Sequence, residues 1–173
     1  KKIKISTKKL GLKNCFQLYP NFLLKKIKIQ TKIKVGFDGL ELQVEKKFKN
    51  FVQCKVSSKG FLDSNKGVHF DNNIKLDPLT RKDIQSILIA KKFGVKIFAL
   101  SFANSARDVL FFRSLINKND ELISKIETKR GFFNRKEITK ASNAILIDRG
   151  DLSRYIDISK IPLAQRIIIN DAK

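Results

Sequence analysis

The fold is decided by a stretch that reads VKIFALSFANSARDVLFFRSLINKNDELISKIE, residues 95–127. Its two ends, Val95–Phe102 and Leu122–Glu127, are rich in apolar residues, as is typical of strands buried on both faces. Between them, Ser105–Ile116 repeats apolar residues at helical spacing. This order of strand, helix and strand predicts two parallel strands joined by a crossover helix.

The alternation of helices and strands extends toward the amino terminus. Thr80–Phe93 has the apolar spacing of a helix, and Thr80 with Asp83 resembles a capping box. Gly94 is suited to end that helix.

The alternation also extends toward the carboxyl terminus. We expect a helix from Asn134 to about Ala141, a buried strand at Ala144–Ile147 and a further helix with Pro162 in its first turn. Residues 67–173 are therefore interpreted as the central part of a (β/α)8 barrel of the TIM type, an α/β fold. Three strands cannot close a barrel, so we expect the remaining strands outside this sequence.

Residues 1–66 have a different pattern, which predicts a separate, small all-β unit, either a barrel or a sandwich. Apolar and polar residues alternate with the period of half-buried strands, and Asp38–Gly39 is a turn signal between two of them. The expected strands are Lys1–Ile5, Leu24–Ile29, Glu41–Phe48 and Asn50–Val56.

The chain is strongly basic, with 37 Lys and Arg against 16 Asp and Glu and a net charge of +21. A basic chain attracts phosphates, although codon composition alone also produces sequences rich in lysine, isoleucine and asparagine. No window has the length and apolarity of a membrane span, and no signal-peptide pattern is present. Cys15 and Cys54 lack a metal-ligand spacing and are expected to be reduced thiols of a cytoplasmic protein.

Chemistry in parallel barrels sits where the strands end, which directs attention to Ser101–Phe102, Lys125–Glu127 and Asp148–Asp151. Glu127 and Asp151 lie at the ends of neighbouring predicted strands and offer two carboxylates to one space. Hard oxygen ligands suit Mg²⁺ or Mn²⁺. Lys125 lies two residues before Glu127, so both side chains leave the same face of the strand.

Six motifs, in order along the chain, resemble the pyruvate kinase family. They read NKGV at residues 65–68, PLTRKD at 78–83, ALSF at 99–102, ISKIE at 123–127, DRGDL at 148–152 and LAQR at 163–166. The resemblance implies transfer of a phosphoryl group from phosphoenolpyruvate to ADP, giving pyruvate and ATP in glycolysis. It also implies that residues 1–66 are a β-barrel-like, all-β lid domain inserted into the (β/α)8 barrel. The protein would be a cytoplasmic homotetramer that requires Mg²⁺ or Mn²⁺ and possibly K⁺.

The resemblance also implies roles for individual residues. Lys125 would stabilise the charge that develops during transfer, and Glu127 and Asp151 would hold the metal ion. Substrate would contact Ser101, Arg149 and Gly150, and Lys66 would reach the nucleotide phosphates. The plainer interpretations are a structural ion pair between Lys125 and Glu127, a surface turn at residues 149–151 and a solvated lysine at position 66.

The sequence departs from the family at two places beside the expected site. The family usually has Ala where this chain has Asp148, and Gly, an aliphatic residue and Glu where it has Ser153, Arg154 and Tyr155. The added carboxylate could join the metal or repel substrate. The family's potassium-binding residues lie in segments that this sequence does not contain.

Two alternatives remain open at this point. One is a divergent pyruvate-kinase-like paralogue with lost or altered activity. The other is a basic nucleic-acid-binding protein that uses the lid-like unit, although we expect no nucleic-acid partner and no membrane partner. That unit has aromatic residues among its lysines, which are either a stacking surface or core: Phe16, Tyr19, Phe22 and Phe37.

Overall fold

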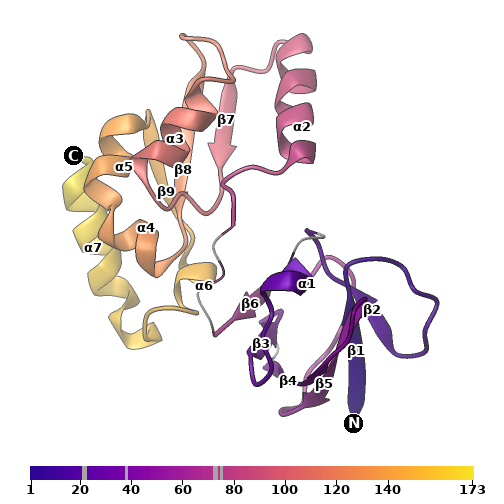
Figure 1. Ribbon diagram of the computed structural model, residues 1–173. Helices are drawn as coiled ribbons and strands as arrows, with labels where there is room; N and C mark the ends of the chain where they lie inside the picture. Colours follow the sequence, from indigo (N-terminus) through magenta and orange to yellow (C-terminus); the bar gives the residue numbers. More distant parts are fainter. Residues whose placement is uncertain (21–22, 38, 72–73, 75) are drawn as a thin grey trace. The chain divides into compact units, whose positions relative to one another are not determined.

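The computed structural model describes residues 1–20, 23–37, 39–71, 74 and 76–173 (Figure 1). The chain forms two compact units, Lys1–Leu76 and Asp77–Lys173.

The first unit is a curled, mostly antiparallel sheet in the strand order β2-β1-β5-β4-β3-β6. The strands β3, β4 and β5 form consecutive antiparallel pairs, β1 pairs antiparallel with β5, and β2 lies parallel to β1. Their bounds are β1 Lys2–Ser6, β2 Cys15–Gln17, β3 Lys32–Val35, β4 Leu40–Lys47, β5 Phe51–Val56 and β6 Val68–Phe70. The expected all-β character is therefore confirmed, with β2, β3 and β6 as additional strands.

One expected strand in this unit is wrong. Residues 23–26 form the short helix α1 (Leu23–Lys26), and residues 27–29 are not in a strand. Leu23, Leu24 and Ile27 are buried while Ile29 is exposed, which is the spacing of a helical turn and not of a strand. The turn signal is only partly described: Gly39 has φ 77°, and Asp38 lies outside the described residues.

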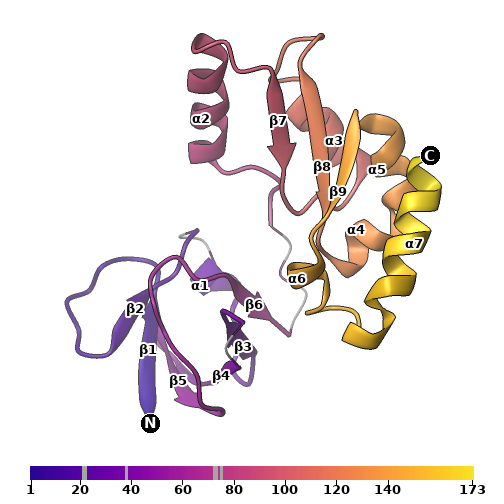
Figure 2. The ribbon, with the colours of Figure 1, turned by 180° about the vertical axis from the view of Figure 1, so that it is seen from behind.

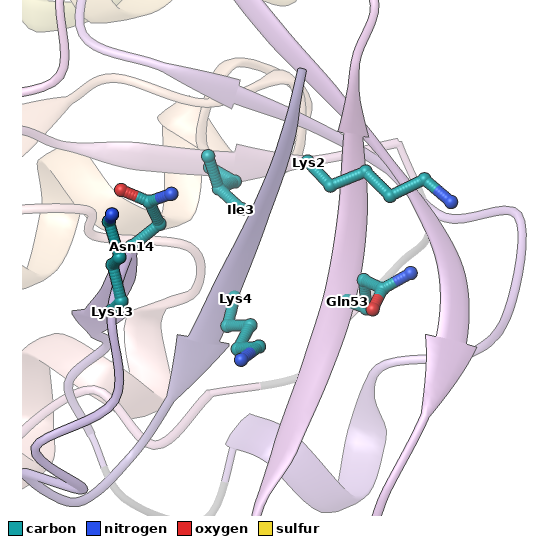
Figure 3. Close-up of a pocket in the computed structure, with 6 residues that line it drawn as sticks. All are labelled: Lys2, Ile3, Lys4, Lys13, Asn14 and Gln53. Carbon is teal, nitrogen blue, oxygen red and sulfur yellow. The ribbon is translucent and has the colours of Figure 1, made fainter.

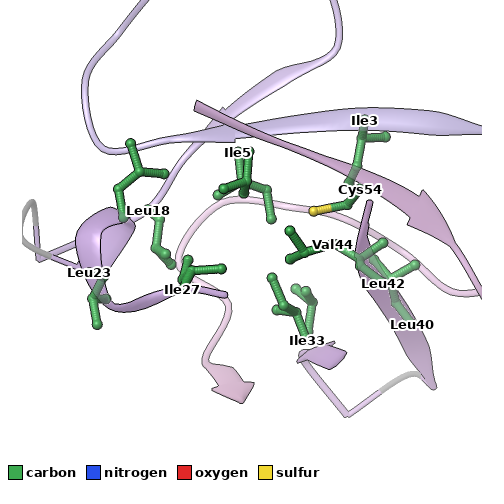
Figure 4. Close-up of a cluster of buried hydrophobic side chains, with 13 residues drawn as sticks. Ile3, Ile5, Leu18, Leu23, Ile27, Ile33, Leu40, Leu42, Val44 and Cys54 are labelled. Carbon is green, nitrogen blue, oxygen red and sulfur yellow. The ribbon is translucent and has the colours of Figure 1, made fainter. Parts of the chain in front are cut away.

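The core of the first unit is made by the alternate residues of its strands. In β4, Leu40, Leu42 and Val44 are buried and the residues between them are partly exposed. Figure 4 shows these side chains facing Ile3 and Ile5 of β1, with Cys54 of β5 among them. Leu18, Leu23 and Ile27 complete the core from the loop and helix beside the sheet.

The second unit contains three parallel strands in the order β7-β8-β9 (Figure 2). This confirms the parallel barrel segment expected for this part of the chain. The bounds are α2 Arg81–Lys92, β7 Ile97–Leu100, α3 Ala106–Arg113, β8 Glu121–Ile126, α4 Lys129–Phe133, α5 Arg135–Ala141, β9 Ala144–Ile147, α6 Arg149–Leu152, η1 Ile158–Lys160 and α7 Ile161–Ala172.

Local signals explain several of these boundaries. Thr80 and Asp83 form the expected capping box at the start of α2, with both reciprocal hydrogen bonds present. Gly94 follows α2 with φ 73°, a conformation that glycine adopts without strain. Asn134 precedes α5, but its side chain makes no cap hydrogen bond there and instead donates to the carbonyl of Asn104.

The strands of the second unit are not buried on both faces within this chain, contrary to expectation. Phe98 and Leu100 are buried against helices α2, α3 and α5, whereas Ile97 and Ala99 are exposed. In β9, Leu146 is also exposed. The described helices thus cover one face of this sheet.

The division between the units falls ten residues beyond the expected domain limit at residues 66/67. Strand β6 pairs with β3, so Val68–Phe70 belongs to the sheet of the first unit. That residues 1–66 are a lid domain and residues 67–173 a part of the barrel domain remains a proposal. None of the described helices is both long and apolar enough to cross a membrane.

Candidate active site

Strand β8 brings Lys125 and Glu127 together at its carboxyl end. The Nζ atom of Lys125 lies 2.6 Å from Oε1 of Glu127. The Lys125 side chain is 21% exposed and that of Glu127 only 1%, so the carboxylate is buried and the pair is sheltered from solvent. The ion pair that the plainer interpretation requires is therefore present.

The second carboxylate oxygen of Glu127 is held by the neighbouring strand end. The backbone N–H of Phe102, just after β7, donates to Oε2 at 2.5 Å. Phe102 makes this hydrogen bond with a backbone φ of 54°, which is an uncommon conformation for a residue with a side chain. Glu127 thus receives one hydrogen bond on each oxygen, as a buried carboxylate requires.

Helix α6 supplies two further carboxylates. Asp148 caps its amino terminus by accepting a hydrogen bond from the N–H of Asp151 at 3.3 Å, and its Oδ2 lies 3.3 Å from Nζ of Lys125. Asp151 lies in the helix, where its Oδ1 is 3.3 Å from Nε of Arg154. One oxygen each of Glu127, Asp148 and Asp151 lies within 4.8 Å of the others.

Burial and these contacts shift the acidity of three groups. Burial raises the pKa of Glu127, and the hydrogen bonds from Lys125 and the Phe102 N–H offset part of that rise. The hydrogen bond with Glu127 raises the pKa of Lys125, so its ammonium form persists at neutral pH. Burial acts to raise the pKa of Asp148, but the Asp151 N–H and Lys125 hold it below its usual value.

A family model described as pyruvate kinase, barrel domain, matches residues 2–173. The chain belongs to the pyruvate kinase family. It is 30% identical to the pyruvate kinase of Borreliella burgdorferi over 169 residues, which are 95% of this chain and 35% of that protein. It is 32% identical to the enzyme of Clostridium acetobutylicum over 152 residues, 85% of this chain and 32% of that protein. For Thermococcus litoralis the identity is 36% over 137 residues, 76% of this chain and 29% of that protein.

The chain thus spans about a third of the length of the pyruvate kinases it matches. Pyruvate kinases use a divalent metal, and the donor set here fits one. The clustered atoms are hard carboxylate oxygens, which Mg²⁺ and Mn²⁺ prefer. One oxygen of each carboxylate lies within 4.8 Å of the others, so Glu127, Asp148 and Asp151 are the residues that would hold the cation.

The other residues predicted from sequence divide between the two units. Arg149 and Gly150 are exposed residues of α6, and Ser101 is exposed directly after β7. All three therefore lie at the carboxyl ends of parallel strands. Lys66 is exposed in the first unit, just before β6, so its part in nucleotide binding stays a prediction.

Two groups that contact the carboxylates of the site were not predicted from the sequence. The Phe102 N–H could not be predicted, because no Gly or Asn marks the positive φ at that position. The contact of Arg154 with Asp151 could have been predicted, because residues three apart in a helical turn are neighbours. Arg154 also occupies a position where the family usually has an aliphatic residue.

The first unit has a basic pocket of about 250 Å³ beside β1 and β5 (Figure 3). It is lined by Lys2, Ile3, Lys4, Lys13, Asn14 and Gln53. Lys2 is paired with Glu45 at 3.6 Å, and Nζ of Lys4 lies 5.6 Å from the centre of the Phe51 ring. These lysines are thus engaged within the unit, and the pocket does not identify a phosphate site.

Three of the four aromatic residues considered for nucleic-acid stacking are not core residues. Phe16, Tyr19 and Phe37 are exposed, and Phe22 lies outside the described residues. Exposure is required for stacking, but it is not sufficient evidence for it.

Proposed function

We propose that the protein containing this chain transfers a phosphoryl group from phosphoenolpyruvate to ADP, with Mg²⁺ or Mn²⁺ as its divalent cation. The observation that carries the proposal is the cluster of Lys125, Glu127 and Asp151 at adjacent strand ends of a pyruvate kinase barrel segment. In this reaction the bond between phosphorus and the enol oxygen breaks, a bond to the β-phosphate oxygen of ADP forms, and the enol carbon takes up a proton.

The chemistry asks mainly for positioning and neutralisation of charge, which these residues supply. Glu127 and Asp151 would hold the cation, which neutralises phosphate charge when bound. Lys125 keeps its charge and lies at the edge of the cluster, so it can stabilise the phosphoryl and enolate oxygens.

The remaining assignments follow the family. Ser101, Arg149 and Gly150 would contact phosphoenolpyruvate or pyruvate. Lys66 would reach the phosphates of ADP or ATP. We propose, as for the family, a cytoplasmic homotetramer in which K⁺ is an additional cation.

Two observations favour a second candidate, a paralogue with altered activity. Asp148 contacts Lys125 at 3.3 Å, and Arg154 contacts Asp151 at 3.3 Å. Both departures from the family therefore touch residues that the reaction would use.

The first test measures Mn²⁺ affinity by the paramagnetic relaxation of water protons, using the full-length protein. The double variant Glu127→Gln, Asp151→Asn should lose most Mn²⁺ binding, because both carboxylate charges are removed. Lys125→Met should keep Mn²⁺ binding but slow phosphoryl transfer by about two to three orders of magnitude, the typical effect of one preorganised charge.

The matched control is Glu121→Gln, Asp157→Asn, which removes the same two charges from exposed positions. This control should bind Mn²⁺ as the wild type does. If both double variants bind Mn²⁺ equally well, the metal centre and the proposed function are refuted. If metal binds as predicted but the wild type transfers no phosphoryl group, the altered paralogue is supported instead.

A further inference from the structure

We propose that Asp148 is a third carboxylate of the metal centre and supplies the negative charge that Arg154 removes by pairing with Asp151. The inference rests on the proposed function, because it concerns the same metal centre. It gives a role to Asp148 and Arg154, two residues at which this chain departs from the family pattern.

Arg154 places a cation on a carboxylate that the metal would use. Its Nε lies 3.3 Å from Oδ1 of Asp151, and the two side chains are only 9% and 23% exposed. Solvent and salt screen such a sheltered pair weakly. Asp151 therefore offers a metal ion less attraction than it would beside an aliphatic residue.

Asp148 is positioned to make up for that loss. Its Oδ1 accepts the Asp151 N–H, which fixes the carboxylate, and its Oδ2 faces Lys125 at 3.3 Å. An oxygen of Asp148 lies within 4.8 Å of oxygens from both Glu127 and Asp151. The three carboxylates therefore face one space, in which they would hold one cation together.

The local charges show why Asp148 and Arg154 belong together. Lys125, Glu127 and Asp151 together have a net charge of −1. Adding Arg154 alone would bring these groups to zero, which removes the net attraction for a divalent cation. Adding Asp148 as well returns the net charge to −1. Each residue thus compensates for the other.

The experiment is a double-mutant cycle on Mn²⁺ affinity, measured by water-proton relaxation on the full-length protein without substrate. Asp148→Asn keeps a side-chain oxygen to cap α6 but removes the charge, and should weaken Mn²⁺ binding at least about tenfold. Arg154→Met should tighten binding. The double variant Asp148→Asn, Arg154→Met should return to within about threefold of the wild type, since the charges again balance.

The matched control is Asp157→Asn. Asp157 also caps a short helix, by accepting the N–H of Ser159, but it is exposed and is not among the clustered carboxylates. The inference is overturned if Asp148→Asn binds Mn²⁺ like Asp157→Asn, or if the double variant is as weak as Asp148→Asn alone. In either case the loss of binding in Glu127→Gln, Asp151→Asn would still support the proposed function, whereas unchanged binding there refutes that function separately.

Discussion

Glu127 illustrates how a single buried charge organises the residues around it. Its side chain is 1% exposed, and an uncompensated carboxylate at such a site would cost several kcal/mol. The Lys125 ammonium and the Phe102 N–H each take one of its oxygens. Because these partners come from β8 and from the end of β7, the charge also joins two strand ends into one site.

Cys54 gives the first prediction at the residue scale. Burial, with a smaller contribution from Glu45, raises the pKa of its thiol from 9.0 to about 12. The folded state therefore favours the neutral thiol, and this stabilisation is complete below pH 9 and lost as the pH rises toward 12. We therefore expect the free energy of unfolding of the first unit to be about 2 kcal/mol lower at pH 10.5 than at pH 8 through Cys54 alone.

Urea unfolding of wild type and Cys54→Ala at pH 8 and pH 10.5 measures this contribution. The substitution leaves a cavity whose cost is independent of pH, so the difference between the two proteins should shrink at the higher pH. A difference that stays constant between the two pH values would contradict the prediction.

Side chains of the site were easier to predict than backbone contacts. Lys125 and Glu127 could be placed on one face because strand residues alternate, and Asp151 joined them because parallel strands end at one edge. The Phe102 N–H could not be predicted, since its direction depends on a positive φ that the residue type disfavours. The capping role of Asp148 needed helix α6, which the sequence analysis did not anticipate.

At the scale of elements, α4 depends on a close approach that only glycine permits. A Cβ atom on Gly131 would lie 2.5 Å from the backbone oxygen of Ala103. The Gly131 N–H also donates to the hydroxyl of Thr128, which caps the helix. We predict that Gly131→Ala destabilises the full-length protein by about 1–3 kcal/mol, measured by urea unfolding, because backbone must move.

Gly67→Ala is the control for this substitution. A Cβ atom at this position meets no atom within 4 Å, so the substitution should change the free energy of unfolding by no more than about 0.5 kcal/mol. Equal stabilities for the two variants would show that the approach of α4 to Ala103 is not a constraint.

Elements with their own local signals were predicted well, and those that depend on packing were not. Helix α2 carries its capping box and Gly94 in the sequence, and it forms where expected. Helix α1 was mistaken for a strand because Leu24, Ile27 and Ile29 also fit an imperfect alternation. Only the burial of Leu23 and the exposure of Ile29 separate the two interpretations, and both depend on the tertiary fold.

At the scale of the whole molecule, the two units differ in how completely their own residues cover them. The first unit encloses one core between its strands, and its edge strands β2 and β6 are only three residues each, which limits edge-to-edge association. The second unit leaves apolar side chains exposed on its sheet, including Ile97 at 59% and Leu146 at 42%.

We therefore predict different behaviour for the two segments when each is produced alone. Residues 1–76 should melt cooperatively as a monomer, whereas residues 77–173 should bind a dye for apolar surface, such as ANS, and aggregate. Calorimetry, dye fluorescence and sedimentation measure these properties. A soluble, cooperatively melting monomer of residues 77–173 would contradict the prediction.

The cap that Asp148 forms on α6 has a consequence for how this chain can have evolved. A new carboxylate beside other carboxylates normally destabilises the protein in which it first arises, so it needs an earlier permissive mutation. Here the N–H of Asp151 donates a hydrogen bond to the new carboxylate, and a capping Asp in place of Ala contributes roughly 1 kcal/mol of stability. The route from the family's Ala to Asp148 is therefore open in one mutational step, without an ancestor that folds poorly.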